Sequence, residues 1–405
     1  MPLPPFEHLL SLGGEGTTPL EARVLSSPYG TPAQRTTLPF AFGQVEAVLR
    51  AVERPTPDPA DLPTLSALGW AQEGQWAMPR GELLRRVGMR LYDALFPPGP
   101  VRTTLAVALA RAREMRSPLP LQLHLDREAG YLGRLPWELA CDEQGYLVQG
   151  GRMALARYLD FPAPPTATAL NGALKVLVIV SRPTDLPALN EEAELQALRD
   201  SLAALNERRG LEVYLLQPAT WREFVDAVSS ERFHIVHFDG HGDFGRRCPR
   251  CRRVISVPAT TCRAGCGANL LGIAPQGHLA FQRADGTADW RSPENLAAAL
   301  FRSSELRLAV LSACRSGAVG KGSLFAGLGP ALIGLGVPAV VAMQAEVSLE
   351  ATTAFAGAFY GALAAGQSLL DATAIARAQL DEEAWFRPAL YLRSKGDARG
   401  TLLGN

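Results

Sequence analysis

The sequence lacks the features that would assign it to a membrane, to the secretory pathway or to a polyanionic partner. No uninterrupted apolar run reaches about 18 residues, the length that a membrane-spanning helix needs. The first residues contain no basic segment followed by an apolar one, so no signal peptide is predicted. The 40 lysines and arginines equal the 40 aspartates and glutamates, which removes any general electrostatic argument for nucleic acid or an anionic membrane. We therefore expect a soluble cytoplasmic protein that binds no membrane and for which nucleic acid is an unfavoured partner.

Repeats and nucleotide-binding loops are also missing. No unit of roughly 20–50 residues recurs along the chain, and the glycine-rich stretch 327–336 matches neither the Walker A motif nor GxGxxG. We therefore predict neither a solenoid nor a nucleotide site. The chain has 405 residues, of which 47% are hydrophobic and 20% charged, so it is long enough for roughly two or three domains with sizeable cores.

A segment rich in proline, alanine and threonine, residues 161–173, separates two kinds of sequence pattern. The segments before it mix strand-like and helix-like patterns, which predicts an α+β domain over residues 1–164. After it, apolar β-branched runs alternate with amphipathic helices, which predicts an α/β domain over residues 165–405, with a doubly wound, mostly parallel sheet flanked by helices. The expected strands of this domain are 174–180, 211–217, 233–239, 306–312 and 338–344, and the expected helices are 191–205, 220–228, 323–336, 349–363 and 369–380.

His241 is the first candidate for chemistry. It lies between Gly240 and Gly242, directly after one of the expected strands. Functional groups gather at the carboxyl ends of parallel strands, and flanking glycines let the backbone approach a ligand closely. A loop histidine without a role explains this motif at least as well when it is considered alone. His234 and His237, inside the strand, are interpreted as core or sheet-face residues.

Cys314 is the second candidate, because it follows another expected strand and precedes a Ser-Gly turn. A buried structural cysteine is the commoner fate of a single thiol. The pair is more informative than either residue, since a thiol and an imidazole at the ends of two strands of one sheet are placed to form a Cys-His dyad. His241 precedes Cys314 by 73 residues, and by 54 once the 19-residue stretch 248–266 is left out. Caspase-type peptidases have roughly 50 residues between the two.

Four of the six cysteines form a cluster within the second domain. They are Cys248, Cys251, Cys262 and Cys266. Two close pairs separated by a ten-residue arm are typical of a structural site for one Zn²⁺ ion with four thiolate ligands. Two disulfides or four reduced thiols are the alternatives. The resulting insertion, residues 246–268, begins close after His241, so we expect it at the rim of the site, where it shapes access for substrate or partner.

These motifs together resemble the CHAT family of caspase-like cysteine peptidases, relatives of the caspases and of separase. The resemblance is carried by the strand followed by GHG, by LSACRSG, and by GVPAVVAMQ with the helix pair that begins at FYGAL. Upstream, RVLSSPYG, LPWELACDEQGYL and VSRPTDLPALNEEAE look like leading segments of bacterial members. The resemblance implies a caspase-like fold with an N-terminal pseudo-caspase half. The tetratricopeptide array that is common in such proteins is absent.

The resemblance also implies roles for individual residues. Cys314 is the implied nucleophile, His241 the implied general base, and the Gly242 amide part of the implied oxyanion hole. Because Ser312 and Ala313 precede Cys314, the caspase QAC signature is not matched, and specificity for aspartate does not carry over.

The resemblance also implies which residues line the S1 pocket, and in this sequence they are Arg182, Asp185, Ser312, Gln344 and Glu346. They follow the first strand, precede the nucleophile, or lie in the loop after the next strand. Glu346 would receive a basic P1 side chain, whereas Arg182 would favour an acidic one. Ordinary loop charge is the alternative for both.

The sequence therefore predicts a cysteine endopeptidase that cleaves protein substrates and is activated by a protein partner or signal. Analogy alone adds a role in bacterial defence or regulated cell death. Two other functions stay open at this point. The first is a catalytically silent module that keeps the fold for protein interaction. The second, which the zero net charge disfavours, is a zinc-dependent nucleic-acid-binding protein.

Overall fold

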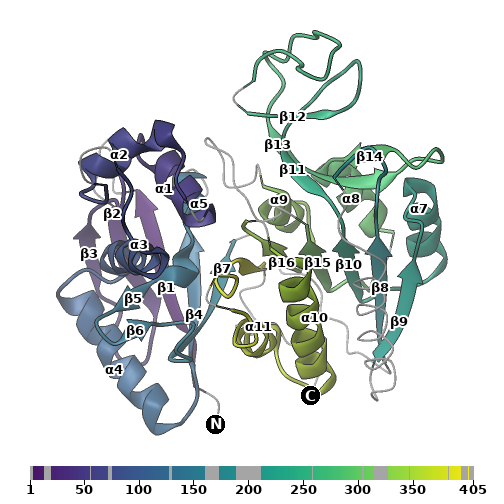
Figure 1. The fold of residues 1–405 in the computed structure, drawn as a ribbon. Helices are drawn as coiled ribbons and strands as arrows, with labels where there is room; N and C mark the ends of the chain where they lie inside the picture. The colour runs from purple at the N-terminus through teal and green to yellow at the C-terminus, as the bar shows by residue number, and fades with distance from the viewer. Residues whose placement is uncertain are drawn as a thin grey trace. The chain divides into compact units, whose positions relative to one another are not determined.

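The fold is described from a computed structural model. It describes residues 3–12, 20–54, 56–71, 75–126, 130–159, 173–187, 211–257, 259–302, 305–313, 327–345, 347–381, 383–393 and 400. The chain divides into two units, Met1–Leu155 and Ala156–Asn405, and Figure 1 shows the elements of each. The domain boundary expected after residue 164 lies within 160–172, outside the described residues.

The first unit contains a small sheet that the sequence predicted only in part. Strand β1 (Phe6–Leu12) pairs antiparallel with β2 (Leu20–Ser26) and parallel with β4 (Leu119–Leu125), and β2 pairs antiparallel with β3 (Ala33–Thr36). Every residue of β4 is buried. The alternating apolar residues of LEARVLS and LPLQLHL predict strands β2 and β4, whereas no such pattern predicts β1 or β3.

Helices and short strands complete this unit. They are α1 (Val45–Glu53), η1 (Pro59–Asp61), α2 (Leu62–Ala67), α3 (Arg80–Leu95), α4 (Pro100–Glu114), α5 (Gly130–Arg134), η2 (Trp137–Leu139), β5 (Cys141–Asp142) and β6 (Gly145–Tyr146); β7 (Met153–Tyr158) contains the boundary between the units. The helical pattern of residues 79–115 belongs to two helices, α3 and α4. Gly99, with φ of 130°, turns the chain between α3 and α4, and Pro100 starts the second helix.

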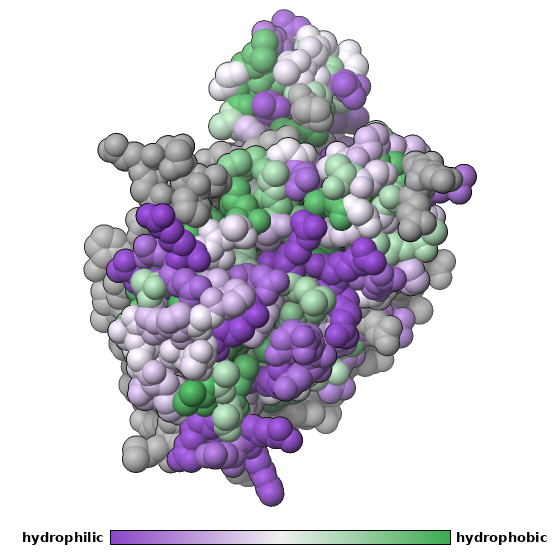
Figure 2. Space-filling view, turned by 90° about the vertical axis from the view of Figure 1, so that its left-hand side faces the viewer, coloured by the Kyte–Doolittle hydropathy of each residue, from purple (hydrophilic) through white to green (hydrophobic). Residues whose placement is uncertain are grey.

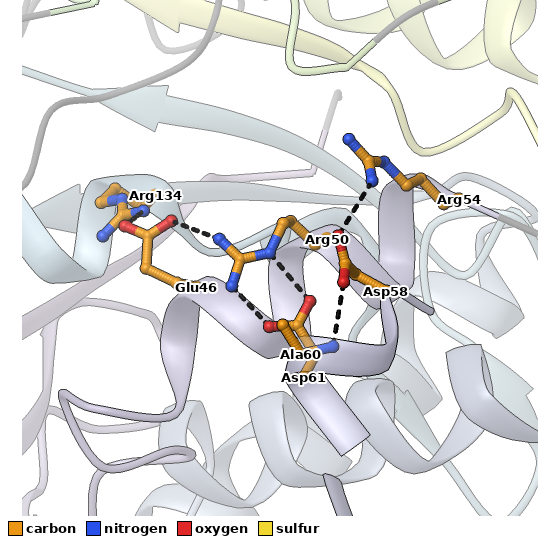
Figure 3. Close-up of polar contacts among 7 residues, drawn as sticks. All are labelled: Glu46, Arg50, Arg54, Asp58, Ala60, Asp61 and Arg134. Atoms are coloured by element: carbon orange, nitrogen blue, oxygen red, sulfur yellow. Dashed lines mark hydrogen bonds and ion pairs between the residues drawn. The ribbon is translucent and has the colours of Figure 1, made fainter. Parts of the chain in front are cut away.

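A polar network stabilises the helical part of the first unit (Figure 3). Arg50 of α1 donates from Nε to one carboxylate oxygen of Asp61 at 2.8 Å and from a terminal nitrogen to the other at 2.5 Å. Arg134 of α5 forms an ion pair with Glu46, which also lies 3.9 Å from Arg50. The hydrogen bond to Asp61 raises the pKa of Arg50. Because Asp61 is nearly inaccessible to solvent, this two-pronged pair fixes α1 against η1.

The second unit contains the mostly parallel sheet that the sequence predicted. Its strands are β8 (Leu174–Val180), β9 (Leu211–Leu216), β10 (Ile235–Asp239), β15 (Leu308–Ser312), β16 (Ala339–Met343) and β17 (Pro388–Leu392). Their order is β17-β16-β15-β10-β8-β9, and only β17 runs antiparallel to its neighbour β16. The end of β7 pairs with β17. Strands β10, β15 and β16 are buried along their whole length, as expected for a sheet covered on both faces.

Helices flank this sheet, and most begin with a sequence-encoded cap. They are α7 (Trp221–Ser230), α8 (Pro293–Leu300), α9 (Leu328–Gly334), α10 (Leu349–Ala364) and α11 (Leu369–Arg377). Thr220 and Glu223 form a reciprocal capping box at α7, which confirms the predicted start of that helix. The expected helix 191–205 and the first residues of 323–336 lie outside the described residues. In the described part of the chain, no helix is long and apolar enough to cross a membrane.

A second, antiparallel sheet in this unit was not predicted. It consists of β11 (Gly242–Arg247), β12 (Val254–Ser256), β13 (Gln276–Gln282) and β14 (Ala288–Arg291) in the order β12-β11-β13-β14. Residues 246–257 and 259–273, which include β12, form the tip of this sheet, at the top of Figure 1. The sheet begins one residue after His241.

Candidate functional site

The ends of three neighbouring strands form the floor of the candidate site. Val180 of β8, Asp239 of β10 and Ser312 of β15 lie side by side in register. The chain passes from β8 to β9 on one side and then crosses to β10 on the other. Ligands bind at such switch points of open α/β sheets, outside the carboxyl ends of the strands. His241 and Arg182, each two residues beyond a strand, therefore lie where this fold class places its functional groups.

His241 is held in one orientation by a backbone carbonyl. Its Nε2 lies 2.8 Å from the Pro187 carbonyl oxygen. Because a carbonyl only accepts, Nε2 carries the proton, and Nδ1 of the neutral ring is left as a proton acceptor. The backbone is fixed as well, since the His241 carbonyl accepts from the Ala280 amide at 3.0 Å. Burial lowers the pKa of His241 and the positive charge of Arg182 lowers it further, whereas the Pro187 carbonyl and Asp239 act in the opposite direction.

The two glycines that flank His241 have distinct structural roles. A side chain at Gly240 would place its Cβ 2.9 Å from the Ser181 carbonyl oxygen and 2.9 Å from a ring carbon of Phe238, too close for either. Gly242 lies opposite Leu279 in the β11–β13 pair, next to the hydrogen-bonded position at His241. Hydrogen-bonding direction alternates along an antiparallel strand, so the Gly242 amide points away from β13. Its direction is compatible with binding a ligand oxygen.

Arg182 is engaged by the strand next to its own. One terminal nitrogen lies 2.7 Å from the Asp239 carboxylate, and the other donates to the carbonyl oxygens of Asp239 at 3.0 Å and Ser181 at 3.1 Å. Only 17% of the Arg182 side chain and 9% of the Asp239 side chain are exposed. From the sequence, Arg182 was a candidate to bind an acidic P1 residue. In the structure its positive charge is already paired with the Asp239 carboxylate.

Two other expected S1 residues also make structural contacts. The Asp185 carboxylate accepts from the Ala288 amide at 2.7 Å. Gln344 accepts from Arg157 at 2.5 Å and donates to the Phe386 carbonyl oxygen at 3.0 Å. These contacts fix the loops after β8 and β16. These contacts do not test whether Asp185 and Gln344 line the S1 pocket, so that role stays a prediction.

Ser312 belongs to a buried hydrogen-bond chain that sequence reasoning missed. Its hydroxyl oxygen lies 2.9 Å from Nε2 of His237, and the Tyr360 hydroxyl lies 3.1 Å from Nδ1 of the same ring. Burial lowers the pKa of His237 to about 4, so the ring is neutral at pH 7. This chain of hydrogen bonds joins β10, β15 and α10 under the strand ends. The sequence placed His237 in the core, but nothing in its periodicity identified Tyr360, 123 residues away, as a partner.

Two predicted site residues, Cys314 and Glu346, lie outside the described residues. The described chain ends at Ala313 on one side of the cysteine, and Ala345 is the last described residue before the glutamate. Their predicted roles therefore stay predictions.

The predicted metal ligands come together at the tip of the second sheet. We call this tip, residues 246–257 and 259–273, the cysteine arm. The sulfur atoms of Cys248, Cys251, Cys262 and Cys266 all lie within 4.8 Å of one another. Cys248 and Cys266 are 3.4 Å apart, and Cys251 and Cys262 are 3.6 Å apart, well beyond the about 2.05 Å of a disulfide.

Two tight turns present these thiols. In the first, the Cys248 amide donates to Arg253 and the Arg252 amide donates back to Cys248, with Arg252 at a φ of 61°. In the second, the Cys262 amide donates to the Ala268 carbonyl oxygen. The turns bring together residues that are up to 18 positions apart, which confirms the clustering that the cysteine spacing predicted.

The thiol cluster fits a tetrahedral metal ion. Thiolates about 2.3 Å from a zinc ion lie about 3.8 Å from one another, close to the 3.4 and 3.6 Å between the sulfur atoms of the two pairs. Burial raises the pKa of Cys248, but amide donors from Cys251 and Arg250 and the neighbouring thiols outweigh it and lower that pKa overall. Burial and the adjacent thiols raise the pKa of Cys262. The Cys248 thiolate thus forms readily, whereas Cys262 resists a second negative charge, which is the condition that a divalent cation relieves.

Comparisons with known proteins agree with the sequence motifs. The family model described as "CHAT domain" matches residues 85–385. Two crystal structures of the Saccharomyces cerevisiae separase–securin complex, at 3.0 and 2.6 Å resolution, are similar to the chain with 9% and 8% identity and a TM-score of 0.48 each. Each match covers 96% of this chain but only 30% of the matched chain, so this protein spans under a third of its length. No curated protein matches the sequence.

Proposed function

Because the chain belongs to the CHAT-domain family of caspase-like proteins, we propose that it is a cysteine endopeptidase with Cys314 as nucleophile and His241 as base. The observation that carries the proposal is the register between Asp239 and Ser312. The strands that lead to His241 and to Cys314 thus end at the same level of the sheet, and each of the two residues follows its strand end by two positions in the sequence. Adjacent strands are only about 4.8 Å apart, which suits a thiol and an imidazole that must exchange a proton.

The proposed mechanism uses the orientation of His241. The Cys314 thiol transfers its proton to Nδ1, and the thiolate attacks the carbonyl carbon of the scissile peptide bond. The oxygen of the tetrahedral intermediate takes the negative charge and accepts a hydrogen bond from the Gly242 amide. The C–N bond then breaks as His241 returns the proton to the leaving amine. Water hydrolyses the thioester with His241 as base, while Pro187 keeps the ring in place.

The S1 proposal favours a basic P1 residue. Arg182 is paired with Asp239, so it is a poor receptor for an acidic side chain, whereas Glu346 remains the candidate receptor for a basic one. Glu346→Gln should abolish a preference for lysine or arginine at P1 in a peptide library. An unchanged P1 profile would refute this assignment.

The proposal also includes one structural zinc ion held by the four thiols of the cysteine arm. The chemistry that the ion supplies is structural, because four protein ligands fill a tetrahedral site. The arm continues directly from His241 through β11. The zinc therefore supports the shape of the site from outside and takes no part in the cleavage step.

Mapping of cleavage sites in a proteome by mass spectrometry tests the proposed activity. Wild type should generate new peptide termini that disappear with Cys314→Ala and with His241→Ala. Cys141→Ala is the matched control, since this buried thiol lies in the first unit, where its sulfur contacts the Arg85 carbonyl oxygen at 3.3 Å. Equal cleavage by wild type and Cys314→Ala would refute the proposal.

A second measurement does not require that the enzyme be activated or that a substrate be known. Iodoacetamide should alkylate Cys314 faster than Cys141, and His241→Gln should slow only the reaction of Cys314, because the imidazole promotes thiolate formation. Burial raises the pKa of Cys141 to about 11, so this thiol is an unreactive internal reference. Equal rates for Cys314 with and without His241 would mean that the two residues form no dyad.

A further inference from the structure

The cysteine arm carries an unusual distribution of charge. Residues 244–284 contain no aspartate, glutamate or lysine, yet six arginines fall between positions 246 and 263. Arg246, Arg247, Arg250, Arg252, Arg253 and Arg263 are these arginines. The chain as a whole has no net charge, so the positive charge of the arm is a local feature. Four thiolates with one divalent ion contribute about −2, which leaves the arm strongly positive.

Three of these arginines have no partner in the described part of the chain. The side chains of Arg250, Arg252 and Arg263 are exposed and form no hydrogen bond or ion pair with any described residue. By contrast, Arg246 donates to the carbonyl oxygens of Ile273 at 2.9 Å and Ala259 at 3.2 Å, so it stabilises the arm itself. The three exposed arginines are therefore available to an external anion.

The metal site holds these three arginines in place. Arg250 lies between two of the thiol residues, Arg252 follows Cys251, and Arg263 follows Cys262. Each is thus next to a ligand of the cluster, and their backbone positions are set by the two turns. Arginines on a rigid turn lose less freedom on binding than arginines on a mobile loop.

The arm lies next to the proposed peptidase site. Strand β11 leads into it from Gly242, one residue after His241. The guanidinium of Arg253 lies 4.0 Å from the carboxylate of Asp185, in the loop that follows β8. A polypeptide that extends from the strand ends would therefore pass the arm.

We propose that Arg250, Arg252 and Arg263 form an exosite that binds an acidic segment of the polypeptide substrate, away from the scissile bond. Guanidinium groups bind carboxylates in a two-pronged geometry. The arm also exposes apolar surface, with Leu271 67% and Val257 37% accessible, and Figure 2 shows hydrophobic and strongly hydrophilic surface side by side at its top. Residues 245–280 contain no phenylalanine, tyrosine or tryptophan on which bases could stack. This composition favours an acidic and partly apolar peptide over a single-stranded nucleic acid.

The binding claim is tested without cleavage. The probe is a fluorescent peptide of alternating glutamate and leucine, added to the full-length Cys314→Ala protein and followed by fluorescence anisotropy. The same peptide with glutamine in place of glutamate measures the charge requirement. Unlabelled single-stranded and double-stranded oligonucleotides of mixed sequence are the competitors.

The test variant replaces Arg250, Arg252 and Arg263 together by glutamine. Glutamine keeps a polar side chain at each position. At position 252, where φ is 61°, it adds no backbone strain beyond that of arginine. The affinity for the acidic peptide should fall about tenfold, as expected for the loss of three exposed charge pairs. The matched control removes three exposed arginines elsewhere, with Arg113, Arg222 and Arg232 changed to glutamine, and should leave the affinity unchanged.

Zinc content and thermal stability show whether the test variant keeps an intact arm. If the arm of the test variant is not intact, the single substitution Arg263→Gln, on the second turn, is used to test the exosite. Its affinity for the acidic peptide should fall about twofold. The proposal is overturned if the test variant binds like wild type or if the control loses as much affinity. It is also overturned if the glutamine peptide binds as tightly, or if oligonucleotides displace the peptide at lower concentration than the unlabelled peptide itself.

The description of the bound peptide as substrate rests on the proposed function, and a separate measurement addresses it. In the active enzyme, the same three substitutions should raise KM for an acidic protein substrate and leave kcat unchanged. They should not affect cleavage of a short neutral peptide. Peptide binding without any cleavage would refute the peptidase and with it the substrate role. Cleavage without peptide binding would refute only the exosite.

Discussion

The main sheet of the second unit and the cysteine arm belong to one unit but are held together in different ways. Strands β10, β15 and β16 are buried throughout and bring large apolar side chains together over long distances in sequence. The buried cluster of the arm consists of Cys248, Cys262, Ala268 and Leu270, with a few partly buried neighbours. A core of this size cannot offset the conformational entropy of an ordered loop. The sheet therefore depends on apolar burial, whereas the arm depends on its thiol cluster and on the zinc ion that we propose for it.

Removal of the metal is expected to separate the two regions most clearly. Each preparation should contain one zinc ion per chain, and a chelator should abolish the slow amide exchange of residues 246–273 while leaving β8, β10 and β15 protected. Zinc supplies on the order of 10 kcal/mol to isolated domains of this type, far more than the apolar cluster of the arm. Metal analysis and hydrogen exchange by mass spectrometry measure both effects.

The cysteines of the chain provide a matched pair for this experiment. Cys248→Ser should lose the zinc and the order of the arm, and Cys141→Ser, outside the cluster, should lose neither. If chelation removed protection across the whole second unit, the arm and the sheet would form one cooperative body. That result would contradict the view that they are stabilised independently.

Acid is expected to weaken the sheet through a buried histidine. The pKa of His237 is lowered from 6.5 to about 4 by burial, so between these values the unfolded chain binds a proton that the folded chain does not. The free energy of unfolding should therefore fall as the pH decreases from 6.5 to 4, by about 3 kcal/mol at most from this residue. Urea unfolding of wild type and His237→Gln at several pH values measures the contribution as the difference in slope. Identical slopes would contradict it.

Tyr360→Phe tests the sheet at a single hydrogen bond. The change removes a hydroxyl 3.1 Å from Nδ1 of His237 and leaves this buried ring nitrogen without its hydrogen-bond partner. The free energy of unfolding should decrease by about 1–2 kcal/mol, with no change in zinc content. Tyr214→Phe is the control, because its hydroxyl contacts Glu212 at the surface, and we expect it to change stability by less than about 0.5 kcal/mol. Equal effects of the two substitutions would mean that the buried chain does not stabilise the sheet.

The smallest expected effect concerns the strand ends between the two regions. Arg182→Gln should raise the pKa of His241, because it removes a positive charge that lowers this pKa and leaves the Asp239 carboxylate, which raises it, without its partner. NMR titration of the imidazole signal should show this upward shift of the pKa. Arg222→Gln, at an exposed site on α7, should leave it in place. The shift should be the same with and without zinc, and a dependence on the metal would show that the arm influences the base.

The parts of the fold that sequence reasoning predicted are those encoded by local pattern. The continuous apolar run LKVLVIV identified β8 because a strand buried on both faces needs apolar residues at every position. The threonine before α7 identified the start of that helix. Strands β11 to β14 were missed because glycine and arginine interrupt them, and because their order comes from pairing with segments far away in the chain. The break between α3 and α4 had a visible signal, Gly99 before Pro100, that outweighs the helical periodicity around it.

The candidate site shows the same division. The spacing of the four cysteines predicted their clustering, because a metal site of close pairs is a local pattern. The position of His241 at a strand end followed from the strand itself. Its contact with Pro187 and the pairing of Arg182 with Asp239 could not be predicted, since each joins segments more than 50 residues apart. Partners of this kind are determined by the tertiary structure.

The hairpin of β11 and β13 has a consequence for how the protein can vary. Its ladder pairs Gly242 with Leu279 and Gly245 with Gln276, so the chain leaves toward the arm and returns from it at neighbouring points. A segment that begins and ends at one place can be lengthened, shortened or exchanged without moving the strands that carry it. The arm can therefore diverge in evolution while His241 keeps its place, and a short turn joining residues 245 and 276 should be compatible with an intact main sheet. Such a hairpin lets the arm vary in sequence independently of the residues that we propose as catalytic.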